Sequence, residues 1–418
     1  MEAGVAGVRV AVAGAGLGGL CLAQGLLRAG AEVTVYERDN GLAGRRQGYR
    51  LHVDARAGLA LQDCLPPELL AAFQATCGQA GTRLTVVSER LRVLKEVTGG
   101  DPAADRYAPA TLSTSVNRLT LREVLASGLD GAIVPGSEVT GYDASGKGVR
   151  VYFADGREAE ADVLVGADGV NSAVRRQYLP GAEPTDTGGR CVYGKTPLRP
   201  AAMERLPDAL EAGFTAVIGG KLGMATGLVR FRNRPGQVAG VRLSAAEDYL
   251  MWGLTADRGQ FGLPDERLLA LSPAELHDLS AELIRSWHPD LRALHAMADI
   301  EETFVVRIRT SPAIAAWHPS RVTVLGDAIH AMSPAGGSGA NTALQDAAQL
   351  CRALTTTADG GITTAIGRYE RQMRDYGYAA VAASARAEAE RGTLRNPLLS
   401  WLYRRAARAQ RPERVQEH

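Results

Sequence analysis

The chain has 418 residues and a formal net charge of +1, with 47 Lys and Arg residues against 46 Asp and Glu residues. This balance lacks the basic surplus of proteins that bind nucleic acid or anionic membranes, and the length allows two or three domains with a large core. The sequence has no run of about 18 apolar residues, so we expect no membrane span. Five scattered cysteines without paired spacing predict a reduced, cytoplasmic compartment rather than a disulfide framework.

The start of the chain predicts a strand, a glycine turn, a helix and a second strand. Residues 9–13 form a small apolar strand, residues 17–28 a helix that stops at Gly30, and residues 33–37 the second strand. This apolar start has no cationic leader, so we expect a strand and turn rather than a signal peptide.

The glycine turn between strand and helix is typical of dinucleotide-binding proteins. Its glycines allow a tight turn and let the backbone approach a pyrophosphate, which the helix N-terminus attracts. An acidic residue that closes the second strand can accept both ribose hydroxyls. The residues expected to bind the dinucleotide here are Gly14, Gly16, Leu17, Gly19, Glu37 and Arg38.

The next segments predict two hairpins and a helix. Residues 83–87 and 91–95 are expected to pair, and a helix over 119–125 is expected to follow Arg118. Alternation over 149–153 and a buried run over 162–166 predict a second hairpin. This hairpin would place Asp168 and Gly169 just past the end of a buried strand.

The second half of the chain predicts another sheet. Segment 186–256 holds several strand candidates, which we assign to an antiparallel sheet of a second domain. A capping box that starts at Ser272 predicts a helix over 272–287. A strand over 304–309 is expected to return to the first domain, and residues 366–390 are expected to be helical.

A second glycine-rich loop follows a predicted buried strand over 322–325. Asp327 can bond a polyol hydroxyl, and a helix that starts near Asn341 would direct its positive end at a ligand in the loop. The loop residues expected to contact a cofactor are Gly326, Asp327, Pro334, Gly337, Gly339, Ala340 and Asn341. A long cofactor held by glycine motifs from both ends of the chain indicates FAD.

The later motifs also have plain structural interpretations. Asp168-Gly169 taken alone is more often a turn that closes a strand, and the loop over 334–341 can be a glycine-rich surface loop. The occurrence of both motifs in one chain with the first glycine turn favours a cofactor site. His330 is expected to be structural rather than catalytic.

Together these three motifs resemble those of the single-component FAD-dependent aromatic hydroxylases, the p-hydroxybenzoate hydroxylase-like flavoprotein monooxygenases, over about residues 8–390. Within this family, the sequence most resembles the tetracycline-inactivating and polyketide-tailoring members. One departure from the family pattern is Ala331, which follows His330 where the family usually has proline. This difference concerns the stiffness of the turn rather than the binding of the cofactor.

The resemblance implies an α/β fold. It comprises a Rossmann-like FAD/NAD(P)-binding domain, an inserted and mainly antiparallel β-sheet substrate domain, and C-terminal helices. We assign residues 1–76, 101–180 and 300–360 to a discontinuous FAD-binding domain, 77–100 and 181–299 to the substrate domain, and 361–418 to a C-terminal helical segment.

The resemblance also implies roles for single residues. Glu37 would bind the adenosine ribose, Arg118 would contact the cofactor, and Asp327 would bind the ribitol. Asp168 and Gly169 would serve FAD and the nicotinamide cofactor together. Arg46 matches the arginine at the start of the loop where the flavin swings. The residues that we expect to act in catalysis are Arg46, Pro334 and Gly337.

The implied reaction is a monooxygenation. NADPH or NADH reduces FAD, O₂ adds to give a C4a-hydroperoxide, and its distal oxygen is transferred to an aromatic or polyketide-like small molecule. The cofactor carries this chemistry, so the protein needs mainly a dry pocket, and no metal site is expected. Epoxidation, Baeyer–Villiger oxidation and a non-redox, FAD-bound cyclisation catalyst remain open alternatives. We expect a monomer or a homodimer.

The predicted second sheet offers candidates for the substrate pocket, although each of them can also be an ordinary sheet residue. The expected pocket residues are Met224, Arg230, Tyr249 and Trp252, with Tyr193, Phe214 and Arg242 as further possibilities.

Overall fold

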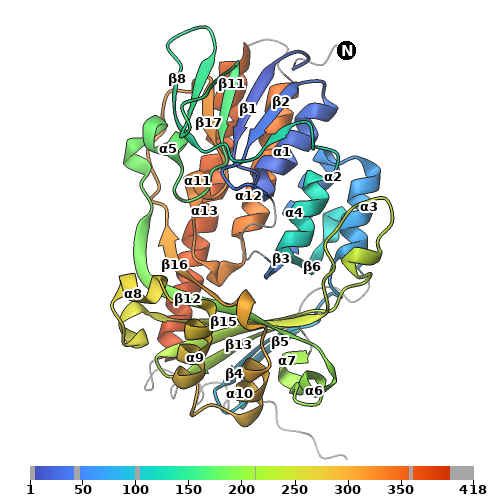
Figure 1. Ribbon diagram of the computed structural model, residues 1–418, viewed down its shortest axis with the longest axis vertical. Helices are drawn as coiled ribbons and strands as arrows, with labels where there is room; N and C mark the ends of the chain where they lie inside the picture. Colours follow the sequence, from blue (N-terminus) through green and yellow to red (C-terminus); the bar gives the residue numbers. More distant parts are fainter. Residues whose placement is uncertain (1–4, 42–47, 99–103, 212, 357–360, 396–418) are drawn as a thin grey trace, which may run out of the picture.

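A five-stranded parallel sheet forms the centre of the upper half of the molecule (Figure 1). The computed structural model describes residues 5–41, 48–98, 104–211, 213–356 and 361–395. Every pairing in this sheet is parallel, and its central strands are continuously apolar because both faces are covered. In spatial order its strands are β17 (Val322–Val324), β11 (Val163–Gly166), β1 (Arg9–Ala13), β2 (Glu32–Tyr36) and β7 (Ile133–Val134).

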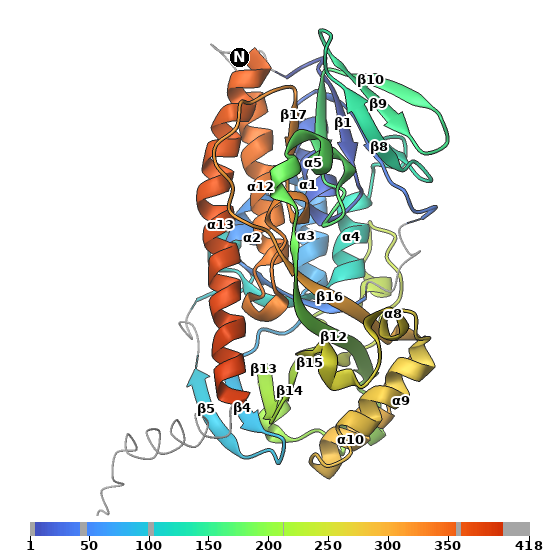
Figure 2. The ribbon, with the colours of Figure 1, turned by 90° about the vertical axis from the view of Figure 1, so that its left-hand side faces the viewer.

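Helices cover one face of this sheet and a small sheet covers the other (Figure 2). The helical layer contains α1 (Leu17–Arg28) and α12 (Gly339–Thr355), which pack on each other and on α2 (Ala55–Cys64). The opposite layer is the antiparallel sheet β8 (Val139–Asp143), β9 (Val149–Phe153) and β10 (Glu158–Ala161). The predicted strand–turn–helix–strand unit at the start of the chain is therefore present.

The lower half contains a seven-stranded sheet in which only β4 and β13 pair in parallel. In spatial order its strands are β16 (Phe304–Thr310), β12 (Thr185–Pro197), β15 (Tyr249–Asp257), β14 (Leu222–Val229), β13 (Gly213–Gly219), β4 (Arg83–Ser88) and β5 (Val93–Thr98). Three helices cover the face turned away from the parallel sheet: α8 (Asp265–Leu269), α9 (Pro273–Leu283) and α10 (Pro289–Ala296). This arrangement confirms the predicted fold class. The strand expected over 304–309 does not return to the parallel sheet, however, because β16 pairs with β12 at the edge of the seven-stranded sheet.

Two further features connect the halves. The two-stranded sheet of β3 (Arg50–Asp54) and β6 (Ser113–Asn117) lies between them, followed in the chain by α4 (Arg118–Ala126). The long helix α13 (Gly361–Arg395) packs on α12 and also contacts β13 and β14 of the lower sheet (Figure 2). None of the helices in the described ranges is long and apolar enough to cross a membrane.

The remaining short elements complete the described chain. They are α3 (Pro67–Thr76), α5 (Ala173–Tyr178), α6 (Pro200–Met203), α7 (Asp208–Glu211), α11 (Asp327–His330) and the 3-10 turns Pro109–Thr111, Pro180–Ala182, Pro235–Gln237, Arg258–Phe261, Ile300–Glu302 and Pro334–Gly336.

Element boundaries differ from the predictions where local backbone geometry decides them. Leu91 has a φ of 58°, so it belongs to the turn, and β5 starts at Val93 rather than at residue 91. The predicted capping box at Ser272 is present, but the helix ends at Leu283 and a second helix begins at Pro289. Asn117 caps α4 by accepting a hydrogen bond from the Thr120 N–H.

Candidate functional site

The first glycine turn has the geometry that a phosphate needs. Gly14 has a φ of 107°, and a Cβ built there would lie 2.5 Å from the Ala167 carbonyl oxygen. A Cβ at Gly19 would lie 2.2 Å from the Gly14 oxygen, so both positions require glycine. The helix after the turn has no side-chain cap and no acidic residue in its first turn. Its free N–H groups are therefore available to an anion.

Glu37 lies at the end of β2, as predicted, and its carboxylate is held by three groups. It accepts hydrogen bonds from the N–H groups of Ala15 and Asp39, both at 3.0 Å, and it forms a 2.8 Å ion pair with Arg122. Arg122 also donates to the Ala15 carbonyl at 2.7 Å. Both side chains are buried, so Arg122 positions the acidic residue against the glycine turn. Arg122 is not among the residues predicted from the sequence, where its only signal is its place one helical turn after Arg118.

A cavity of about 260 Å³ brings the first two motifs together. Its walls include the glycine turn, the end of β2 with Arg38, the side chain of Arg118, and the Asp168-Gly169 turn. A Cβ at Gly14 would lie 3.0 Å from the Cα of Asp168, so the two motifs are in direct contact. The three segments come from distant parts of the chain and converge on one space.

Asp168 has one satisfied and one unsatisfied carboxylate oxygen. Its Oδ2 accepts from the N–H groups of Ala173 at 2.7 Å and Val174 at 3.4 Å. Its Oδ1 is buried without a hydrogen-bond partner among the described residues. Burial raises the pKa of this carboxyl group. A ligand hydroxyl or N–H donor in the adjoining cavity would satisfy the orphaned oxygen.

Asp327, at the start of the second glycine loop, combines an exposed side chain with a desolvated carboxyl group. Its side chain keeps accessible surface, yet the surrounding protein desolvates the carboxyl group and raises its pKa. The two observations agree if the accessible surface opens into an enclosed space rather than to bulk water. The positive charge of Arg118 acts on the same carboxyl group, which places the two predicted cofactor residues near each other.

A buried network holds the strand end that precedes this loop. Asp346 of α12 accepts from the Gly326 N–H at 2.7 Å and bonds the ring of His330 at 2.6 Å. The Tyr376 hydroxyl of α13 donates to its other oxygen at 2.7 Å. His330 and Asp346 are fully buried, which agrees with the structural role predicted for the histidine. The network positions Asp327 because it fixes the residue before it.

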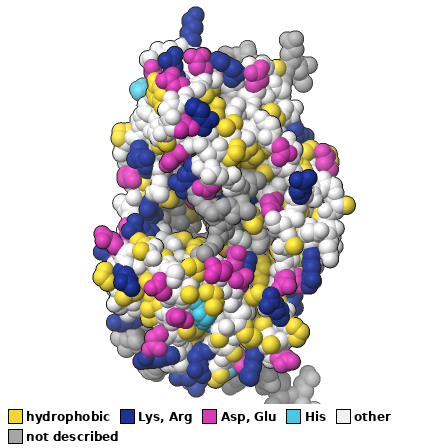
Figure 3. Space-filling view, in the orientation of Figure 1, with side chains coloured by type: hydrophobic (Ala, Val, Ile, Leu, Met, Phe, Trp, Pro, Cys, Tyr) yellow, Lys and Arg dark blue, Asp and Glu magenta, His cyan; other side chains and the backbone are white. Residues whose placement is uncertain are grey.

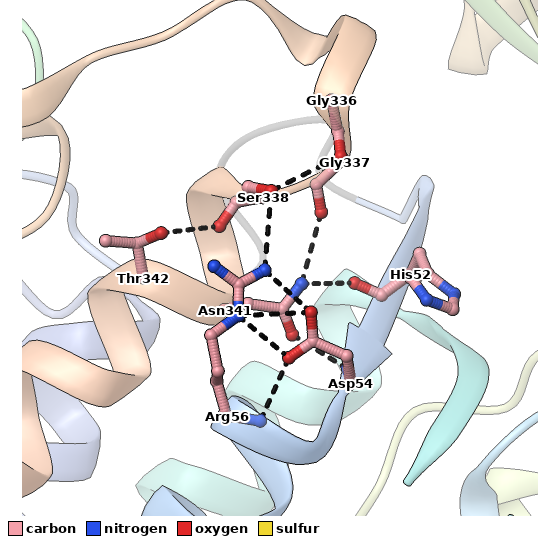
Figure 4. Close-up of polar contacts among 8 residues, drawn as sticks. All are labelled: His52, Asp54, Arg56, Gly336, Gly337, Ser338, Asn341 and Thr342. Atoms are coloured by element: carbon pink, nitrogen blue, oxygen red, sulfur yellow. Dashed lines mark hydrogen bonds and ion pairs between the residues drawn. The ribbon is translucent and has the colours of Figure 1, made fainter. Parts of the chain in front are cut away.

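Asn341 ties the glycine loop to β3 (Figure 4). Its side-chain amide donates to the carbonyl oxygens of His52 at 3.0 Å and Gly337 at 3.1 Å, and its Oδ1 accepts from the Asp54 N–H at 2.9 Å. The side chain is thus occupied within the protein, and only the backbone of Asn341 remains for a cofactor. The loop itself contains a 3-10 turn that starts at Pro334, and Gly337 follows it with a φ of 61°.

The neighbouring loop positions can also be placed. Gly339 is the first residue of α12, followed by Ala340, and a Cβ at Gly339 would lie 3.9 Å from an Asp327 carboxylate oxygen. A Cβ at Gly336 would lie 2.6 Å from the Ser384 hydroxyl of α13, whereas the space around a Cβ at Gly337 is open. Arg46 lies outside the described residues.

The predicted substrate residues do not share one face of the lower sheet. Trp252 and Met224 lie in the core beneath α8, α9 and α10, because alternate residues of a strand point to opposite faces. Tyr249 lies on the other face, in a cluster that includes Tyr49 from the upper half. Arg230 forms a 2.9 Å ion pair with Glu211. The structure therefore keeps Tyr249 and Arg230 near the space between the halves and removes Met224 and Trp252 from it.

The sheet face that looks toward the parallel sheet combines aromatic and very small residues. Tyr193 stacks on Phe304 and on Tyr49, with ring centroids 5.4 and 5.6 Å apart. Ala216 and Ala225 are paired on central strands, yet both keep accessible surface. The space-filling view shows the molecule hollowed between its two halves (Figure 3). Partly exposed aromatic rings thus lie on the sheet face that looks toward the parallel sheet and its cofactor motifs.

Comparisons with known proteins agree with this geometry. A family model described as an FAD binding domain matches residues 277–384, and one described as an NAD(P)-binding Rossmann-like domain matches residues 12–62. The chain is 35% identical over 385 residues to the dual O-methyltransferase/FAD-dependent monooxygenase elcB of Phaeosphaeria nodorum, which covers 84% of this chain and 40% of that protein. The chain therefore spans less than half the length of this relative.

Two other relatives match along most of their length. The 6-hydroxynicotinate 3-monooxygenase of Pseudomonas fluorescens is 30% identical over 367 residues, which cover 87% of this chain and 86% of that enzyme. The crystal structure of a Photorhabdus luminescens protein regarded as an FAD-containing monooxygenase superposes with a TM-score of 0.77 at 33% identity, covering 91% of this chain and 97% of that one. On these matches, which cover most of both chains, the chain belongs to the p-hydroxybenzoate hydroxylase-like family of FAD-dependent monooxygenases.

Proposed function

We propose that this protein is an NAD(P)H-dependent FAD monooxygenase that acts on an aromatic or polyketide-like small molecule. The observation that carries the proposal is the cavity on which the first glycine turn, Arg118 and Asp168 converge, with Asp327 of the second glycine loop near enough to Arg118 to be affected by its charge. The reaction would consume NAD(P)H, a proton, O₂ and the substrate, and it would yield the hydroxylated product, NAD(P)⁺ and water.

FAD fits the residues that are present. The glycine turn and the N-terminus of α1 would hold its pyrophosphate, Glu37 its adenosine ribose, and Asp327 its ribitol. The orphaned oxygen of Asp168 would accept a hydrogen bond from the same ligand. When bound, FAD supplies the redox chemistry and the activation of O₂.

The protein itself would position the substrate and exclude water from the reacting region. The loop from Pro334 to Gly337 would cover the reacting region, and the Asn341 side chain keeps that loop attached to β3. Tyr49, Tyr193 and Phe304 would bind an aromatic ring and exclude water from it. We take Arg46, Pro334 and Gly337 as the residues nearest to the reacting atoms, on the strength of the family resemblance.

The free cysteines support a reducing, cytoplasmic location. All five are buried, and none of them forms a disulfide among the described residues. We propose that the enzyme works there as a monomer or a homodimer.

Substrate-stimulated oxidation of NAD(P)H tests the proposed function. The purified protein, saturated with FAD, is given NADPH or NADH with a panel of phenols and aromatic polyketides, and the decrease in nicotinamide absorbance is followed. At least one compound should accelerate the oxidation and be recovered with one added oxygen atom. A protein that binds FAD but oxidises no NAD(P)H with any panel member would instead support a non-redox role.

A further inference from the structure

Arg50 is a desolvated cation on the sheet face between the two halves of the molecule. It lies on β3, and its side chain rests on β14, where a Cβ at Gly227 would come within 2.8 Å of its Cδ and Nε atoms. Only glycine at position 227 leaves room for the guanidinium group to lie flat on the strand. Burial lowers the pKa of Arg50 to about 10, so the group still carries its charge at neutral pH.

The contacts of Arg50 orient its guanidinium group without neutralising it. Its Nε donates to the Leu228 carbonyl oxygen at 3.3 Å, and its carbon Cζ lies 5.8 Å from the centroid of the Phe214 ring. Within the described ranges, no carboxylate forms an ion pair with Arg50, and its terminal nitrogens have no hydrogen-bond partner. Arg50 keeps some accessible surface, but the surrounding protein desolvates its guanidinium group. A desolvated cation without an anion is costly, and such groups are usually paired.

The groups that face Arg50 do not supply the missing charge. Among the described residues, Tyr249 and His52 interact electrostatically with Arg50. Burial raises the pKa of the Tyr249 hydroxyl, and burial together with the charge of Arg50 lowers the pKa of His52, so both stay neutral. Glu211 is the only carboxylate among the described residues that line the adjoining cavity, and it is already paired with Arg230 at 2.9 Å. The charge of Arg50 is therefore available to a ligand.

A cavity of about 210 Å³ opens beside this charge. Ser115 and the Leu228 backbone form its inner wall with Arg50, while the exposed residues Gln79 and Thr82 lie at its rim. The inner wall thus offers the guanidinium group as the donor for an anionic oxygen, because the Ser115 hydroxyl already donates to the Leu228 carbonyl at 3.3 Å. This cavity belongs to neither glycine motif and lies on the same sheet face as the aromatic cluster of Tyr49 and Tyr193.

We propose that Arg50 and this cavity form an anion-binding subsite, which accepts a carboxylate or phenolate group of the aromatic substrate. The inference rests on the proposed function for the identity of the ligand as substrate, and it narrows the substrate class to acidic aromatic compounds. The guanidinium group determines specificity by charge and takes no part in the transfer of oxygen.

Binding to the FAD-loaded enzyme in the absence of NAD(P)H tests this subsite. Three acids are compared with their carboxamides: 2,4-dihydroxybenzoate, 1-hydroxy-2-naphthoate and anthraquinone-2-carboxylate. Dissociation constants are measured from the change in flavin absorbance or fluorescence and by calorimetry. The wild type should bind at least one acid more tightly than its amide. Arg50→Met should weaken that acid roughly 10- to 100-fold and leave the amide almost unchanged, and Arg50→Lys should retain part of the preference.

Arg205→Met is the matched control, because Arg205 forms an exposed pair with Asp290 at the helix-covered side of the same sheet. It should change neither dissociation constant. The subsite is refuted if the wild type prefers none of the three acids, or if Arg50→Met weakens acid and amide alike while the FAD content stays normal. The test measures binding and not turnover. Its result can therefore be interpreted even if the protein proves not to be a monooxygenase.

Discussion

The ion pair of Arg122 with Glu37 offers a quantitative test of how the adenosine end of the site is built. The side chains are 3% and 8% exposed, and Arg122 also donates to the Ala15 carbonyl. Arg122→Met would leave the Glu37 carboxylate buried without its counter-charge. Loss of one partner from a buried pair costs about 3–5 kcal/mol. We therefore expect urea denaturation of the apo-protein to show a loss of that size.

The same substitution should weaken FAD binding, because Glu37 would no longer be held toward the glycine turn. A loss of about 1.4 kcal/mol corresponds to about tenfold in affinity, and we expect at least this effect. In the double variant Glu37→Gln/Arg122→Met, part of the stability should return because no buried charge remains, while FAD affinity stays low.

Arg9→Met is the matched control. Arg9 pairs with Asp162 at 3.1 Å at the other end of the same strands, but its side chain is 46% exposed. Exposed pairs contribute little, so this variant should change stability only slightly. Equal losses for Arg122→Met and Arg9→Met would refute the account of Glu37 as a residue positioned by a buried partner.

Three further results are expected. Asp327→Ala should lower FAD affinity by roughly 10- to 150-fold through loss of a charge-assisted hydrogen bond, measured by titration of the apo-protein, and wild-type affinity would refute the ribitol assignment. At Gly337 an added side chain would find open space, but the φ of 61° strains a β-branched residue and should displace the loop. Gly337→Val should therefore still bind FAD but release most reducing equivalents as hydrogen peroxide. If its coupling of NAD(P)H oxidation to product equals that of the wild type, this loop does not shield the reaction. Burial raises the pKa of Glu370 from 4.5 to about 7, so the folded state binds the extra proton, and this contribution to stability should be lost as pH rises from about 4.5 to 7. Glu370→Gln should flatten that part of the stability–pH curve, and an unchanged slope would contradict the assignment.

The cofactor motifs could be predicted from the sequence because their requirements are local. Gly14 and Gly326 have positive φ values of 107° and 63°, and glycine at such positions after an apolar strand is a signal within one short segment. Glu37 follows from the end of the next strand. The βαβ unit therefore appears at the predicted place with almost the predicted bounds.

The partners of these motifs could not be predicted in the same way. Arg122 is 85 residues from Glu37 in sequence, and the carboxylate of Asp346 reaches back to Gly326 from the next helix. Neither residue has a local pattern that sets it apart from an ordinary helical residue. The environment of Arg50 likewise depends on a distant residue, because Gly227 of the seven-stranded sheet leaves space for its side chain.

Two of the four expected pocket residues, Met224 and Trp252, lie on the opposite face of the sheet for a reason that was open to sequence reasoning. Tyr249 and Trp252 are three residues apart on one strand, so they point to opposite faces and cannot both line one pocket. Both residues were expected in the pocket on the basis of side-chain type alone. Strand parity would have separated the two, although which face looks toward the cofactor depends on where α9 and α10 pack.

The central claim, that the protein transfers an oxygen atom from O₂ to its substrate, has one direct measurement. The FAD-loaded enzyme is incubated with NAD(P)H and an accepted aromatic compound under ¹⁸O₂, with a parallel reaction in H₂¹⁸O under ordinary O₂, and the products are compared by mass spectrometry. The account predicts one ¹⁸O atom per product molecule under ¹⁸O₂ and none from labelled water. Product oxygen that comes from water, or product formed without added oxygen, would contradict it.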